Sequence, residues 1–221
     1  MTDFKFNPAM CFHPSDIVRY LDAGDIIDNK LHNELIASLV VQGVHKVMME
    51  WDNIFLYFIP KDGRQKELIE AIGSTVLRED VLDFFQKNVE ENSEFDVIVI
   101  DRTDQKMAEY RPIQLKRFGI RIDPDKLTEE FLKFLDKKIM LYAKNKGSLY
   151  VYLENKGTLQ FAPITEHLKS IDFPFEELTV FALNERGNFN VCQLYPTADE
   201  VITFEIERSI AFPGKSNLQG N

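Results

Sequence analysis

Residues 95–101 of the chain read FDVIVID, and residues 113–118 follow twelve positions after Asp101 with IQLKRF. The first segment is a short apolar run rich in β-branched residues, which is typical of a buried strand. The second segment predicts a neighbouring strand. Its residues Gln114 and Lys116 should share a face, because side chains two positions apart on a strand point the same way. We expect this pair of strands to lie at the centre of the fold.

Three polar side chains of these two segments could meet above one edge of the pair: Asp96, Gln114 and Lys116. A carboxylate, an amide oxygen and an ammonium together can hold a divalent cation and orient a water molecule. Asp101 is the alternative acid. Strand alternation places it on the opposite face from Asp96, so only one of the two can belong to the site. We favour Asp96, since it lies at the entrance of the strand.

The charge of the chain is uneven. Its formal net charge of −10 argues against a protein that coats nucleic acid through an overall basic field. Residues 102–146, however, carry twelve Lys and Arg against seven Asp and Glu, a net of +5, whereas the rest of the chain carries −15. A local basic stretch therefore surrounds the Gln-Leu-Lys segment.

The sequence also predicts where the protein works. Cys11 and Cys192 are too few and too far apart for a disulfide framework, so we expect two free thiols in a reducing compartment. The N-terminus lacks the features of a signal peptide, and no apolar run approaches the length of a membrane span. We expect a cytoplasmic protein that does not enter a membrane.

Periodicity and turn signals predict one α/β domain over residues 1–212, with a mixed central β-sheet flanked by helices. An inserted hairpin and helical segment is expected at about 46–93, and a flexible tail at 213–221. Ser15 is expected to cap a first helix, and Gly43 to end a second. Further helices are expected at 65–72, 77–89, 127–144 and 163–170, and further strands at 149–154, 178–183, 189–195 and 201–206.

The order of these features resembles the restriction-endonuclease-like superfamily, also known as PD-(D/E)XK. The resemblance covers roughly residues 30–155: a helix with Glu34, the Asp96-led strand, the strand with Gln-Leu-Lys at 114–116, a helix, and the LYVYL strand at 149–153. It implies a metal-dependent nuclease that hydrolyses phosphodiester bonds of DNA or RNA with Mg²⁺ or Mn²⁺. Members of the superfamily often form homodimers.

The resemblance assigns a role to each matching residue. It makes Asp96 the principal metal ligand, with the amide oxygen of Gln114 and the main-chain carbonyl of Leu115 on the same ion. Lys116 would orient or activate the attacking water and stabilise the charge of the transition state. Glu34 would reach the site from its helix through water.

The chain departs from the superfamily pattern at Gln114, in the long segment before Asp96, and at Asp101, which could replace Asp96. Gln114 stands where many members have Glu, and a neutral amide attracts a divalent cation less strongly. Sixty-one residues separate Glu34 from Asp96, which leaves Glu50 as a rival to Glu34. The alternative function is therefore a catalytically inactive nuclease fold that serves as an interaction or regulatory module.

Overall fold

The computed structural model describes residues 7–23, 29–48, 51, 53–59, 65–73, 86–87, 89–92, 94–101, 109–119, 122–142, 147–154, 157–184, 186, 188–197 and 201–204. The chain divides into two compact units, Met1–Ile113 with Ile206–Asn221, and Gln114–Glu205. One strand, β4 (Glu109–Phe118), begins in the first unit and ends in the second. The predicted single domain over 1–212 stays a prediction, and the predicted tail lies outside the described residues.

The first unit contains an antiparallel ladder of four strands. They are β1 (Cys11–Phe12), β2 (Ile54–Phe58), β3 (Val97–Asp101) and the beginning of β4. All five residues of β3 are buried, as expected for an apolar strand with a neighbour on each side. Val97 lies opposite Ile113, which confirms the predicted pairing of the two central strands.

The described residues of the first unit include helices α1 (Pro14–Asp22), α2 (Asn29–Met48) and α3 (Gln65–Ile72), and a short 3₁₀ turn at Pro8–Met10. The prediction that Gly43 ends the second helix is wrong, because α2 continues for another turn. Val44 and His45 in that turn are buried, and their burial outweighs the roughly 1 kcal/mol that a helical glycine costs. Of the hairpin expected within residues 46–93, the structure describes Met48, which is helical, and β2, which pairs with β1 and β3; residues 49, 50 and 52 lie outside the described residues.

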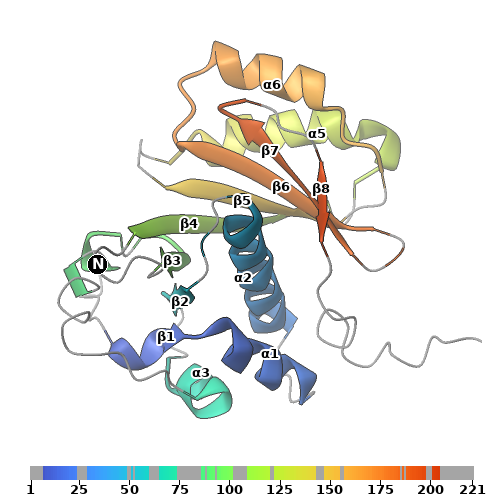
Figure 1. Ribbon diagram of the computed structural model, residues 1–221. Helices are drawn as coiled ribbons and strands as arrows, with labels where there is room; N and C mark the ends of the chain where they lie inside the picture. Colours follow the sequence, from blue (N-terminus) through green and yellow to red (C-terminus); the bar gives the residue numbers. More distant parts are fainter. Residues whose placement is uncertain are drawn as a thin grey trace, which may run out of the picture. The chain divides into compact units, whose positions relative to one another are not determined.

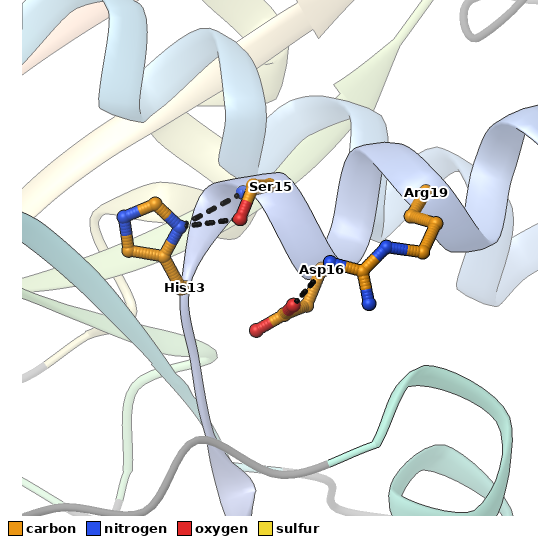
Figure 2. A network of polar contacts seen from close by, with 4 residues as sticks. All are labelled: His13, Ser15, Asp16 and Arg19. Atoms are coloured by element: carbon orange, nitrogen blue, oxygen red, sulfur yellow. Dashed lines mark hydrogen bonds and ion pairs between the residues drawn. The ribbon is translucent and has the colours of Figure 1, made fainter.

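The start of α1 differs from the prediction by two residues. Its N-cap is His13, whose Nδ1 accepts a hydrogen bond from the main-chain N–H of Ser15 at 3.2 Å (Figure 2). The Ser15 hydroxyl lies 2.6 Å from the same nitrogen, and Arg19 pairs with Asp16 one turn along. Ser15 therefore supports the cap from inside the helix, where Pro14 takes the first position.

The second unit contains a mixed sheet. The end of β4 is followed by β5 (Ser148–Leu153), β6 (Glu177–Leu183), β7 (Phe189–Tyr195) and β8 (Ile202–Phe204). Strands β5 and β6 are parallel and are joined through α6 (Phe161–Ser170), whereas β6, β7 and β8 pair antiparallel. The predicted α/β class with a mixed sheet is confirmed.

Helices α5 (Leu127–Phe134) and α6 lie side by side over one face of this sheet (Figure 1). A 3₁₀ turn at Pro124–Lys126 precedes α5, and a π-helical segment, Leu135–Ile139, continues it. The buried side chains of this run recur every four residues: Leu127, Phe131, Leu135 and Ile139. Within the described residues, no helix is both long and apolar enough to cross a membrane.

Burial of Cys11 makes the stability of the protein sensitive to alkaline pH. Burial raises the pKa of this thiol from 9.0 to about 12, so the unfolded chain releases the proton at lower pH than the folded one. The stabilisation is complete below pH 9 and is lost as the pH rises towards 12, at about 1.4 kcal/mol per pH unit. Denaturant titrations at pH 8 and pH 11 should show a fall roughly 2.5 kcal/mol smaller in Cys11→Ala than in the unmodified protein. Equal falls in the two proteins would contradict this account.

Candidate functional site

Asp96 lies immediately before β3, where the main chain is tightly held. Its N–H donates to the carbonyl of Ile113 at 3.0 Å, and its own carbonyl accepts from the N–H of Ile59 at the same distance. The residue is partly exposed. Asp101, the alternative acid, ends β3 with 6% of its surface exposed, opposite Ile54 and Glu109. Asp96 is therefore the more accessible of the two acids.

Gln114 and Lys116 occupy alternate positions of β4 and share a face with Phe118. The Phe118 ring lies 5.0 Å from the ring of Phe131 and 5.1 Å from that of Phe134, so this face of β4 points towards α5. The Gln114 side chain is 1% exposed, and Lys116 is half-buried. The strand and the shared face were predicted, but the cover provided by α5 was not.

The ammonium of Lys116 lies over an aromatic ring. Its Nζ is 5.3 Å from the centre of the Tyr142 ring, within the range of a cation–π interaction. Tyr142 follows the π-helical segment, and its N–H donates to the carbonyl of Ile139 at 3.0 Å. Such contacts contribute about 0.5–2 kcal/mol, depending on how far the cation is removed from water. Lys116 therefore has a defined position within the second unit.

The opposite face of β4 carries an ion pair. Arg117 Nε donates to Glu154 Oε1 at 2.6 Å, and Nη2 contacts the same oxygen. The N–H of Glu154 donates to the carbonyl of Phe118 at 2.9 Å, which joins the ends of β4 and β5. The Glu154 side chain is 12% exposed against 41% for that of Arg117. Arg117 thus compensates a carboxylate that is largely removed from water.

The remaining candidate, Glu34, is half-buried on α2, and its rival Glu50 lies outside the described residues. Glu34 and Asp96 belong to the first unit, whereas residues 114–116 belong to the second. The predicted convergence of these side chains therefore stays a prediction.

The chemical types of the donors can be compared with the needs of a metal ion. A carboxylate, an amide oxygen and a main-chain carbonyl are the hard oxygen ligands that Mg²⁺ prefers. The set of Asp96, Gln114 and Leu115 carries a single negative charge, so it suits a weakly held ion that keeps several waters. Among the described residues, no group of three or more His, Cys, Asp and Glu is arranged to hold a metal.

A second polar cluster lies at the beginning of the parallel strands β5 and β6. The hydroxyl of Ser148 donates to Glu177 Oε2 at 3.0 Å, and the hydroxyl of Thr179 donates to Oε1 at 2.9 Å. All three side chains are buried. Because both carboxylate oxygens accept hydrogen bonds, the cluster satisfies much of the hydrogen-bonding capacity of a buried acid.

The Arg117–Glu154 ion pair and the Lys116–Tyr142 contact were not predicted from the sequence. Glu154 directly follows the LYVYL strand, and Arg117 is the penultimate residue of the Gln-Leu-Lys strand. Pairing of the two strand ends would therefore have brought them together. Tyr142 gave no such signal. It lies in a predicted helix, and the π-helical segment before it changes which way the following residues point.

Comparisons with known proteins return no relative of this chain. The sequence matches no protein-family model, and no curated protein or solved structure is significantly similar to it. The functional argument therefore depends on the chemistry of the residues described above and on the order of the elements that carry them.

The Arg117–Glu154 pair predicts a specific pattern of stability. Arg117→Met leaves the Glu154 carboxylate without its cation and should lower the free energy of unfolding by about 1–3 kcal/mol. Adding Glu154→Gln removes the charge that needs compensation, so the double variant should recover part of that loss. Urea denaturation of the two single variants and the double variant measures the coupling. Strictly additive effects would show that the pair contributes no coupling energy.

Proposed function

We propose that this chain is a nuclease-like protein of restriction-endonuclease-like fold that hydrolyses phosphodiester bonds of DNA or RNA with a divalent metal ion. The observation that carries the proposal is the hydrogen bond from the N–H of Asp96 to the carbonyl of Ile113. Ile113 directly precedes Gln114 in the chain, so the pairing of β3 with β4 brings the main chain of the acid to the start of the Gln-Leu-Lys segment.

The order of the elements gives further support. Helix α2 with Glu34 is followed first by β2 and α3, and then by β3, β4, α5 and β5. The resemblance implies a helix with an acid, the Asp-led strand, the strand with Gln-Leu-Lys, a helix and a further strand, in this order. The hydrogen bond between the ends of β4 and β5 agrees with it, since it makes β5 the next neighbour of the strand that carries Lys116.

Each residue of the proposed site has a distinct task. Asp96, Gln114 and the carbonyl of Leu115 would hold a divalent ion, which would supply Lewis-acid polarisation of the phosphate when bound. Lys116 contributes an ammonium beside the phosphate, where it stabilises the negative charge that develops during attack by water. Glu34 orients water from its helix.

A second candidate function is a non-catalytic module on the same fold. Three observations favour it: the Gln114 side chain is 1% exposed, the ammonium of Lys116 already contacts Tyr142, and the net charge is −10. Such a protein would keep the sheet and bind a partner without cleaving nucleic acid.

Cleavage assays separate the two functions. Single- and double-stranded DNA and RNA, labelled at one end, are incubated with the protein and Mg²⁺ or Mn²⁺. We expect cleavage by the unmodified protein and a loss of at least about 100-fold in Asp96→Asn and in Lys116→Ala, since each removes a group that stabilises charge in the transition state. Chelation by EDTA should abolish cleavage in every case.

Lys169→Ala is the matched control, because Lys169 is an exposed lysine on α6 of the same unit as Lys116. Circular dichroism verifies that all variants are folded. Cleavage that persists undiminished in Lys116→Ala would overturn the proposal. The absence of cleavage with every substrate and both metals would favour the non-catalytic module.

A further inference from the structure

The contact between Lys116 and Tyr142 is part of a longer row of aromatic rings. The Tyr142 ring lies 5.4 Å from that of Phe175, Phe175 lies 5.9 Å from Phe173, and Phe173 lies 5.2 Å from Tyr195. Phe173 and Phe175 are buried, with 3% of their surface exposed. All four rings belong to the second unit, so the row is anchored in its core.

This row fixes one end of the Lys116 side chain. A lysine has a flexible four-carbon stem, and holding it in one conformation costs up to about 2 kcal/mol of side-chain entropy. A ring held by buried neighbours offers the ammonium a surface that is already in place. The Lys116 side chain therefore loses less entropy when a ligand binds. The π-helical segment at Leu135–Ile139 precedes Tyr142 and contributes to the direction in which its ring projects.

We infer that Tyr142 is a positioning residue for the ammonium of Lys116, and this inference rests on the proposed nuclease function. The face of an aromatic ring attracts a cation through its quadrupole and has no comparable attraction for a neutral amine. Lys116 therefore acts as a fixed positive charge beside the phosphate. The aromatic row at 142, 173, 175 and 195 supports this charge from the core.

Nuclear magnetic resonance tests the placement without any need for activity. In protein labelled at the lysine ε-carbons, the Lys116 signal is assigned by its disappearance in Lys116→Arg. We expect an upfield ring-current shift of its ε-protons relative to the other lysines. The shift should vanish in Tyr142→Leu and persist in Tyr142→Phe, which keeps an aromatic face.

Kinetics test whether the placement matters for cleavage. Tyr142→Leu should lower kcat by about 3-fold to 30-fold, which corresponds to the loss of a cation–π contact, and should leave KM within about twofold. Tyr142→Phe should restore kcat. Tyr152→Leu is the matched control, because it removes a ring of the second unit that stacks on Phe181 outside the row, and it should leave the Lys116 shift and kcat unchanged.

The outcomes distinguish this inference from the proposed function. A Lys116 shift that is insensitive to Tyr142→Leu overturns the inference even in an active nuclease. An active enzyme whose kcat is the same in Tyr142→Leu also overturns it. A shift that responds to Tyr142 in a protein that cleaves no nucleic acid overturns the proposed function and the catalytic role of the contact, and leaves it as a structural contact of the second unit.

Discussion

The alternation of side chains along β4 is the constraint on which the candidate site depends. Within ten residues this strand carries the β3 pairing at its beginning and the hydrogen bond to Glu154 at its end. Because successive side chains point to opposite faces, Gln114, Lys116 and Phe118 must lie together on the α5 side. Arg117 must lie on the other side, where it meets Glu154. Lys116 and Arg117 are consecutive residues, but they lie on opposite faces of β4, and Arg117 is already paired with Glu154.

Burial changes what each polar residue of β4 can do. Gln114 is buried, and in such surroundings an amide dipole acts more strongly than it does in water. Lys116 keeps partial access to water while its ammonium contacts a ring. Gln114, where this chain departs from the superfamily pattern, is responsible both for the low charge of the proposed metal ligands and for the burial of one of them.

The sequence predicted the central strands because the apolar pattern that marks them lies entirely within residues 95–118. It also predicted the order of elements from α5 to β8 and the shared face of Gln114 and Lys116. It failed where a distant contact overrides a local preference. Gly43 did not end α2 because Val44 is buried beyond it. Tyr142 was missed because its direction follows a change of helix type that no residue pattern marks.

The buried carboxylate of Glu177 has a consequence for how the second sheet assembles. Ser148 lies opposite Glu177 in the pairing of β5 with β6, and Thr179 lies two residues along on the same face. If β6 slid by two residues, the apolar ladder on the other face would still match, but the acid would lose the hydroxyl of Ser148. The cluster thus favours the observed register over one shifted by two residues, although the apolar contacts of the other face would be similar in both. A polar group that adds little to stability can in this way make the alignment of two parallel strands unique.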